Sequence, residues 1–184
     1  MPSTYNRLGI QLMATGENAG TWGTKTNTNL DLIAETWGYI SIDVAGADVT
    51  LAMTSGSSSN GRNYILEFTG TLAGNRVVDI PAQAGSPAAN IEKGFIVVDK
   101  TNRSGSAYSL TFKVTGATGF ALTEGTTYLC YHNGTDIIDT GLGAATAPGG
   151  STTEIQFNNS GAFGGSSKLA WDGTNVLIDT EGAL

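Results

Sequence analysis

The chain has few of the residue types that usually carry out catalysis or bind metals. It contains one cysteine, Cys130, and one histidine, His132. A single cysteine excludes an intrachain disulfide, and protein zinc sites usually need three or four ligands, of which Cys and His supply only two here. The two residues are also two positions apart in an expected strand, so their side chains point in parallel rather than at each other. We therefore expect ordinary packing roles for both.

Charged residues are also scarce, at 14% of the chain, against ~25% in typical soluble domains. The nine Lys and Arg residues are scattered, and the net charge is −7. Nucleic-acid binding is disfavoured, because phosphate recognition needs a clustered basic surface. No apolar run approaches the ~20 residues that span a bilayer, and the N-terminal residues lack the features of a signal peptide. We therefore expect no membrane insertion, and synthesis in a cytoplasm.

Acidic residues are present, but no spacing pairs any two of them for catalysis. Six lie near the ends of expected strands: Glu67, Asp79, Glu92, Asp99, Asp136 and Asp139. Acidic residues there commonly form turns, which disfavours the paired carboxylates of glycosidases. The pairs Asp136/Asp139 and Asp172/Asn175 offer oxygen ligands to calcium, although turn formation explains both. Nucleophile-elbow and phosphate-loop motifs are missing as well, so we expect no enzyme, no cofactor and no metal.

One segment near the N-terminus has helical periodicity. Its apolar and small residues recur at intervals of three and four: Trp22, Thr26, Leu30, Ile33, Ala34 and Trp37. This pattern predicts a helix from about Lys25 to Trp37 that ends at Gly38. Residues 1–20 form an irregular lead in which Ile10–Met13 could be a short strand. The two tryptophans must pack on a β domain or on a neighbouring chain.

From Tyr39 to about Thr140 the period changes to two, which predicts about eight strands. They are Ile40–Val44, Val49–Met53, Tyr64–Phe68, Arg76–Ile80, Phe95–Asp99, Leu110–Val114, Tyr128–His132 and Thr135–Asp139. Asn133-Gly134 predicts a hairpin between the last two. The two dense runs, Arg76–Ile80 and Phe95–Asp99, suggest strands buried on both faces. The fold expected is mainly β, an antiparallel sandwich or jelly-roll-like domain behind a short N-terminal helix.

Four tyrosines of this region admit two readings, because exposed tyrosines can stack on sugars. They are Tyr64, Tyr108, Tyr128 and Tyr131. Burial tendencies favour core positions for them.

A glycine-rich linker is expected at residues 141–152, followed by a small β segment at 153–184. Short strands are expected at Ile155–Phe157, Leu169–Trp171 and Val176–Ile178, with turns at Asn158–Gly161 and Asp172-Gly173. So small a unit cannot bury enough apolar surface alone, so identical chains are expected to cover it. The expected divisions are therefore 1–38, 39–140, 141–152 and 153–184.

Two stretches resemble segments of bacteriophage fibre proteins. ENAGTWGTKTNTNLDLIAE (Glu17–Glu35), with YNRLGIQLMATG before it, resembles the N-terminal segment of tail-fibre-like proteins of phages, particularly those of aquatic bacteria. EIQFNNSGAFGGSSKLAWDGTNVLI (Glu154–Ile178) resembles a segment that recurs in phage fibre shafts. The resemblance implies a virion-docking element made of Trp22, Gly23, Asn27, Asn29, Leu30, Ile33 and Trp37. It also implies trimer or shaft contacts at Phe157, Phe163, Trp171 and Ile178.

We therefore expect a structural protein of a phage virion, a homotrimeric tail fibre or its proximal part, which anchors to the tail and supports host attachment. Its expected partners are identical chains, other virion proteins of the tail or capsid and, through distal parts, a host surface glycan. Two alternatives stay open: a head fibre or capsid-decorating protein, and a carbohydrate-binding adhesin module. A glycan depolymerase is disfavoured, because such enzymes usually need a much longer chain.

Overall fold

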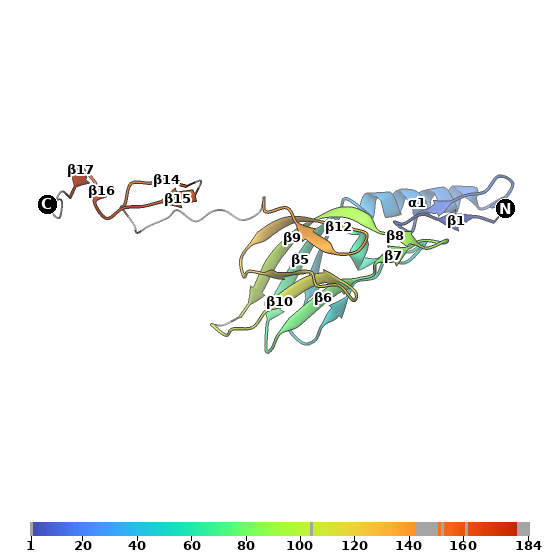
Figure 1. Ribbon diagram of the computed structural model, residues 1–184. Helices are drawn as coiled ribbons and strands as arrows, with labels where there is room; N and C mark the ends of the chain where they lie inside the picture. Colours follow the sequence, from blue (N-terminus) through green and yellow to red (C-terminus); the bar gives the residue numbers. More distant parts are fainter. Residues whose placement is uncertain (1, 104, 143–150, 152, 161, 180–184) are drawn as a thin grey trace. The chain divides into compact units, whose positions relative to one another are not determined.

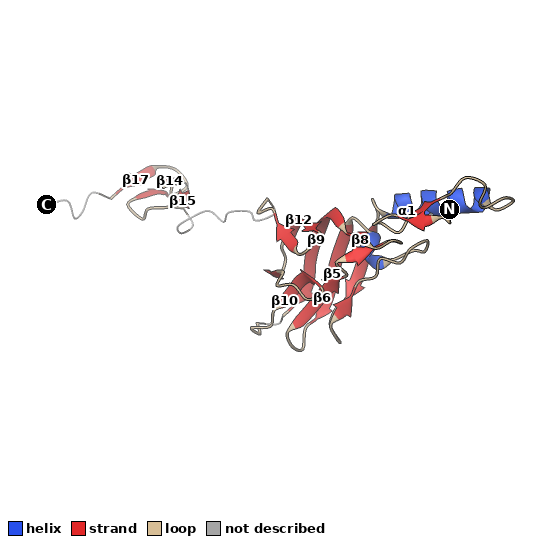
Figure 2. Ribbon diagram, turned by 45° about the vertical axis from the view of Figure 1, so that its right-hand side comes forward, coloured by secondary structure: helices blue, strands red, loops and turns tan. Residues whose placement is uncertain are grey.

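The computed structural model describes residues 2–103, 105–142, 151, 153–160 and 162–179. The chain divides into two compact units, Met1–Ala144 and Ala145–Leu184, which we describe separately. The described residues form one α-helix and many short strands, so the expected mainly β fold with a short N-terminal helix is confirmed (Figure 2). Most of the expected linker, residues 143–150 and 152, lies outside the described residues.

Two sheets face each other in the first unit (Figure 1). The larger has five strands in the order β13-β12-β9-β5-β3, and the smaller has four in the order β11-β10-β6-β4. Their bounds are β3 (Tyr39–Asp43), β4 (Val49–Thr50), β5 (Ile65–Thr71), β6 (Arg76–Ile80), β9 (Glu92–Asn102), β10 (Leu110–Val114), β11 (Phe120–Leu122), β12 (Thr127–Asn133) and β13 (Ile137–Asp139). All eight predicted strands are therefore present in some form, and β11 is an addition that the sequence pattern did not predict.

Successive strands from β3 to β10 alternate between the two sheets, and the last strands pair as hairpins. Strands β3, β5 and β9 lie in the five-stranded sheet, and the intervening β4, β6 and β10 lie in the other. Each sheet therefore grows by strands that run in the same direction, and the pairs β3–β5, β5–β9, β4–β6 and β6–β10 are parallel. Only the later pairs, β9–β12, β12–β13 and β10–β11, are antiparallel. The sandwich is thus mixed rather than wholly antiparallel.

The core lies between the sheets and is built from alternating residues. Phe68 of β5 and Phe95 of β9 pack edge-on against Phe112 of β10, with ring centroids 5.7 and 5.9 Å apart. All three side chains are fully buried. The two dense runs are not buried on both faces: in β6 and β9 buried residues alternate with half-buried ones. Tyr128 joins the core as expected, whereas the core prediction is wrong for the exposed Tyr108 and Tyr131.

The helix α1 spans Trp22–Glu35, so it begins three residues before the predicted start and ends two before the predicted end. Trp37 lies just beyond it, with its N–H donating to the Ala34 carbonyl at 3.1 Å. Gly38 does not adopt the left-handed conformation expected of a terminating glycine. It is needed for a close approach instead, because a Cβ atom there would lie 2.7 Å from Oδ1 of Asn63.

The lead segment folds back on itself and forms hydrogen bonds with a turn later in the chain. It forms a two-stranded ladder of β1 (Thr4–Tyr5) and β2 (Gln11–Leu12), the latter within the predicted Ile10–Met13. Tyr5 exchanges two backbone hydrogen bonds of 2.9 Å with Ser86. Ser86 lies in the turn between β7 (Gln83–Ala84) and β8 (Ala89–Asn90). A single 3₁₀ turn, η1 (Asn60–Arg62), follows β4.

The second unit contains two hairpins among its described residues. One pairs β14 (Phe157–Asn159) with β15 (Ala162–Gly164), and the other pairs β16 (Leu169–Trp171) with β17 (Val176–Ile178). The last two strands have the predicted bounds, whereas the first strand is displaced by two residues from the predicted Ile155–Phe157. Asp172 forms the expected turn, accepting the N–H groups of Thr174 and Asn175 at 2.8 and 2.7 Å.

Candidate docking surface

The helix α1 directs its apolar residues away from its own domain. Trp22, Leu30 and Ile33 are 65%, 57% and 44% exposed, and Trp37 just beyond the helix is 74% exposed. Their spacing places them on one face, and we call these four side chains the apolar stripe. Leu32 is the one buried residue of α1. The stripe is therefore an unusual surface, since exposed apolar groups that cluster commonly mark interaction sites.

Polar contacts attach α1 to its own domain. The Asn29 side chain exchanges two hydrogen bonds with the backbone of Gln11 in β2: it accepts the Gln11 N–H at 3.0 Å and donates to the Gln11 carbonyl at 2.8 Å. This pair ties the middle of the helix to the lead segment, beside which α1 runs in Figure 1. Asn29, which the resemblance assigns to virion docking, is thus engaged inside its own chain.

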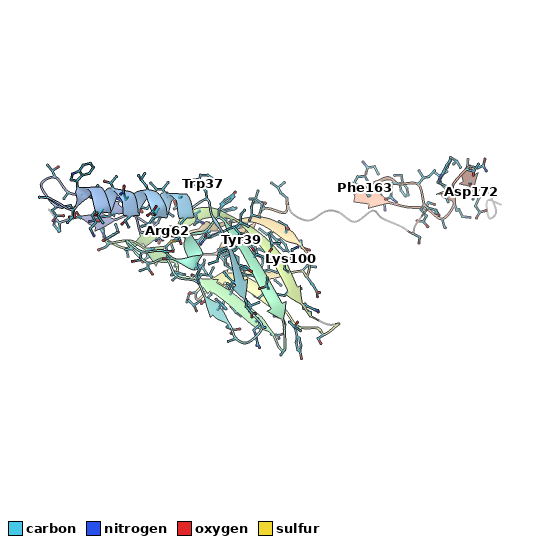
Figure 3. All side chains as sticks on the ribbon, turned by 180° about the vertical axis from the view of Figure 1, so that it is seen from behind. Trp37, Tyr39, Arg62, Lys100, Phe163 and Asp172 are labelled. Carbon is cyan, nitrogen blue, oxygen red and sulfur yellow. The ribbon has the colours of Figure 1, made fainter. Side chains whose placement is uncertain are left out.

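Arg62 fixes the C-terminal end of α1. Its side chain is fully buried, and its Nη1 lies 2.9 Å from Oε2 of Glu35, the last residue of the helix. The guanidinium also donates to the carbonyls of Leu8, Ser57 and Thr54, at 2.8, 2.7 and 2.7 Å. A buried ion pair is tolerated only when its remaining hydrogen-bonding groups are satisfied, and here carbonyls from two separate segments satisfy them. Figure 3 shows Arg62 beneath the helix.

Glu35 and Gly9 complete this cluster. Oε1 of Glu35 accepts the hydroxyl of Ser58 at 3.0 Å and the N–H of Ser59 at 2.8 Å. Gly9 has a φ of 73°, and a Cβ atom at this position would lie 2.7 Å from Nη2 of Arg62. The lead segment can therefore pass this close to the guanidinium only with glycine at this position. The orientation of α1, and with it the outward stripe, depends on this cluster.

The two sheets of the sandwich present different outer faces. On the five-stranded sheet, Tyr39, Ile65, Ile96 and Leu129 lie opposite one another across four strands. Tyr131 and Ile138 form a neighbouring row. Tyr39 and Tyr131 are exposed, and the other four are half-buried.

The outer face of the four-stranded sheet is more polar. It carries Val77, Asp79, Thr111 and Lys113. The outer face of the five-stranded sheet also carries the polar Ser41, Glu67 and Lys100, so its apolar part is the two rows at Tyr39 and Tyr131.

Trp37 connects the stripe with the five-stranded sheet. Its indole ring lies 5.7 Å from the ring of Tyr64, centroid to centroid, at an interplanar angle of 50°. Tyr64 precedes β5 and lies against Gly94 of β9. In Figure 3 Trp37 is labelled at the end of the helix, and Tyr39 marks the start of β3 on the same side of the domain. The apolar stripe thus continues onto the outer face of this sheet.

The second unit exposes the four side chains expected to make trimer or shaft contacts. Phe157, Phe163, Trp171 and Ile178 are 46%, 62%, 46% and 70% exposed. Phe163 and Asp172 are labelled in Figure 3 on the two hairpins of this unit. Described by itself, this unit has no buried residue among those whose burial is recorded. Its hairpins therefore lack a core of their own in the described part.

The remaining predicted docking residues lie on α1 outside the stripe. Gly23 is half-buried and Asn27 is exposed.

Sequence reasoning missed Arg62 and Glu35, which position the helix, and it missed Leu32, which the helix buries. Arginine within a polar segment gives no sign of burial, so no local signal marked Arg62.

Cys130 and His132 have the packing roles expected of them. Burial raises the pKa of the Cys130 thiol to about 12, which leaves it protonated and unreactive at neutral pH. His132 is 1% exposed, its Nδ1 accepts the Gly134 N–H at 2.9 Å, and its Nε2 lies 3.2 Å from the Pro81 carbonyl. These partners fit a neutral imidazole with the proton on Nε2, and burial lowers the pKa of His132 in agreement.

The acidic residues also have structural partners rather than one another. Asp99 is fully buried and lies 2.5 Å from Nη2 of Arg103. Asp79 accepts the Thr115 hydroxyl at 2.9 Å, and Glu67 accepts the Tyr39 hydroxyl at 2.8 Å. Asp136 accepts the Gly119 N–H at 2.9 Å, which joins the turn before β13 to the residue that precedes β11. Within the described part of the chain, no three His, Cys, Asp or Glu side chains are grouped closely enough to hold a metal ion.

Comparisons with known proteins found no match among family models, curated proteins or solved structures. Among the described residues, no helix has the length and apolar character required to cross a membrane.

Proposed function

We propose that this protein is a structural component of a bacteriophage virion, a homotrimeric tail fibre or its proximal part, without catalytic activity of its own. The observation that carries the proposal is the apolar stripe of α1, held outward by the Arg62–Glu35 and Asn29–Gln11 contacts. The resemblance of Glu17–Glu35 and Glu154–Ile178 to phage fibre segments supports the assignment to a virion.

The spacing of the stripe supports identical chains as its partner. Leu30, Ile33 and Trp37 follow one another at intervals of three and four, the spacing of the contact positions in helices that pack side by side. A helix of 14 residues is too short to be stable alone, so neighbouring copies would also stabilise it. Symmetric assembly brings the same face of each copy to a common axis.

The second unit supports the same conclusion independently. Its described hairpins expose Phe157, Phe163, Trp171 and Ile178. Isolated two-stranded hairpins are marginally stable in water, and copies of the same hairpins around an axis would bury these side chains. A fibre needs no chemistry, because multivalent attachment supplies affinity without new contacts.

The proposal is tested with the double variant Leu30→Asp/Ile33→Asp. Charges buried at an interface are costly, so this variant is expected to sediment as a monomer and to be missing from purified particles. The matched control is Thr21→Asp/Thr24→Asp, which adds the same two charges at exposed positions at the start of α1 outside the stripe. The control is expected to assemble and to be incorporated normally.

Normal assembly and incorporation of the stripe variant would overturn the proposal. Electron microscopy of particles carrying a labelled chain distinguishes the tail from the capsid. Label on the capsid surface would replace the tail-fibre assignment by a head fibre or decorating protein.

A further inference from the structure

A cavity of about 180 Å³ lies where the end of α1 meets the five-stranded sheet. Its walls are formed by Leu8, Thr36, Trp37, Tyr64, Lys93 and Gly94. The surface that these residues present to the cavity is almost wholly apolar. All six residues belong to one chain and one compact unit, so the cavity does not depend on the proposed assembly.

Lys93 and Thr36 contribute little polar surface to the cavity, because their polar atoms bond elsewhere. The Nζ atom of Lys93 donates to the Asn63 carbonyl at 2.9 Å and lies 3.9 Å from the centre of the buried Phe95 ring. The Thr36 hydroxyl donates to the Ile33 carbonyl at 2.6 Å. The charged end of Lys93 is therefore turned toward the core, and a ligand in the cavity meets apolar atoms.

Gly94 keeps the space beside Tyr64 open. It lies in β9 without a positive φ. A Cβ atom at this position would lie 3.4 Å from Cε2 of Tyr64, which is an ordinary van der Waals distance. Neither the backbone conformation nor a clash therefore requires glycine here, in contrast to Gly9. The missing side chain leaves the wall of the cavity clear.

Two aromatic rings form adjoining walls and narrow the class of ligand. The rings of Trp37 and Tyr64 are tilted by 50°, with 5.7 Å between their centroids. Trp37 is 74% exposed, so a ligand in the cavity would remove indole surface from water. A third aromatic ring packs favourably on such walls in a tilted or offset arrangement. An apolar cavity of about 150 Å³ takes up benzene, so this cavity accommodates a six-membered ring with a small substituent.

We propose that this cavity binds a small neutral aromatic molecule of a single ring, held by apolar contacts with Leu8, Trp37 and Tyr64. Removal of apolar surface from water, on the ligand and on these walls, drives the binding. A charged substituent would lose its hydration and gain no partner, so charge on the ligand lowers its affinity. An added methyl group that is buried raises the affinity about fourfold.

The test titrates the full chain with toluene, benzene and benzoate, and follows the NMR signals of the Gly94 amide and the Trp37 indole N–H. We expect saturable shifts of both signals, with toluene about fourfold tighter than benzene. Benzoate is expected to bind at least about tenfold more weakly than toluene. The absence of saturable shifts with toluene, or equal affinities for benzoate and toluene, would overturn the proposal.

Two variants assign the binding to the cavity. Gly94→Val fills the space beside Tyr64 and is expected to weaken toluene binding at least about tenfold. Ser41→Val places the same side chain at an exposed position on the outer face of the same sheet and is expected to leave the affinity unchanged. Equal affinities of Gly94→Val and the native chain would contradict the site.

The same titration of Leu30→Asp/Ile33→Asp separates this inference from the proposed assembly. The variant is expected to bind toluene as tightly as the native chain does, so the failure of either proposal can be recognised without the other. Binding to the variant alone would mean that a neighbouring copy fills the cavity in the assembly, and it would overturn the proposal of a free ligand.

Discussion

The sandwich and the helix α1 use the same kind of apolar pattern in opposite ways. In β10, Leu110, Phe112 and Val114 alternate with half-buried residues and point into the core. In α1, Leu30 and Ile33 recur at helical spacing and point away from the domain. A periodic pattern therefore predicts the element, but it does not tell whether the chain itself covers the apolar face.

The difference has a physical cause in what each element packs against. The strands face a second sheet whose side chains are apolar, so apolar burial drives their packing. The helix faces backbone groups of the lead segment and of residues 54–59, which need hydrogen bonds. Asn29 and Glu35 supply them. With the buried Leu32 they attach the helix to its domain, so Leu30 and Ile33 are left exposed for a partner.

The largest expected changes in stability distinguish a core residue, Phe112, from a residue of the proposed interface, Ile33. Phe112→Ala removes a fully buried ring and is expected to lower the free energy of unfolding by ~3–5 kcal/mol at every protein concentration. Ile33→Ala is expected to act only through assembly, so its effect should vanish on dilution. Denaturant unfolding at several protein concentrations checks both. A loss for Ile33→Ala that is independent of concentration would mean that the chain itself covers the stripe.

Arg62→Met tests what holds the stripe outward. It leaves Glu35 without a cation and the carbonyls of Leu8 and Thr54 without a donor, so we expect a loss of about 3 kcal/mol or more in unfolding free energy. Amide exchange of α1 and the lead segment should also accelerate. Arg76→Met, which loses two hydrogen bonds to the half-buried Ala45 carbonyl but no ion pair, is the control and should cost about 1 kcal/mol. Equal losses for the two variants would contradict the role of Arg62.

Lys93→Met is expected to raise the free energy of unfolding, by less than Phe112→Ala or Arg62→Met lowers it. Unfolding restores the pKa of Lys93 from about 7 to its usual 10.5, so below pH 7 the folded chain carries a buried charge that the unfolded chain solvates. The shift sets an upper limit of about 5 kcal/mol, and the lost hydrogen bond to Asn63 reduces the expected gain to about 2 kcal/mol.

The stabilisation by Lys93→Met is expected to depend on pH. The native chain gains stability as the pH rises from about 7 to about 10.5, because the unfolded state binds the extra proton in that range. The gain of Lys93→Met should therefore shrink to nothing over the same range. Thermal melts of both chains across it measure the difference, and a difference that does not change with pH would exclude the buried charge as its cause.

Local pattern was enough to predict most of the elements. The runs Arg76–Ile80 and Leu110–Val114 are strands with the predicted bounds. Asn133-Gly134 lies in the turn between β12 and β13 as expected, with Gly134 at a φ of 97°.

The pairing of the strands could not be predicted in the same way. Alternation of buried and exposed residues is the same in half-buried parallel and antiparallel strands. Whether β4 lies beside β3 or in the opposite sheet depends on the path of the loop between them.

The candidate surface was predictable in part. The resemblance singled out Trp22, Leu30 and Ile33, which the structure places together on one exposed face. The cluster around Arg62 and the cavity beside Lys93 were not predictable, because each joins residues from segments far apart in the chain. Leu8, Trp37 and Lys93, for example, meet only after the lead, the helix and β9 have packed.

The mass of the native chain in solution tests the central claim most directly, that the apolar stripe is an interface between identical copies. Analytical ultracentrifugation at micromolar concentration is predicted to give a species of three times the 18.9 kDa mass of one chain. The Leu30→Asp/Ile33→Asp variant is predicted to give the mass of one chain in the same experiment. A native chain that sediments as a monomer at this concentration would contradict the account.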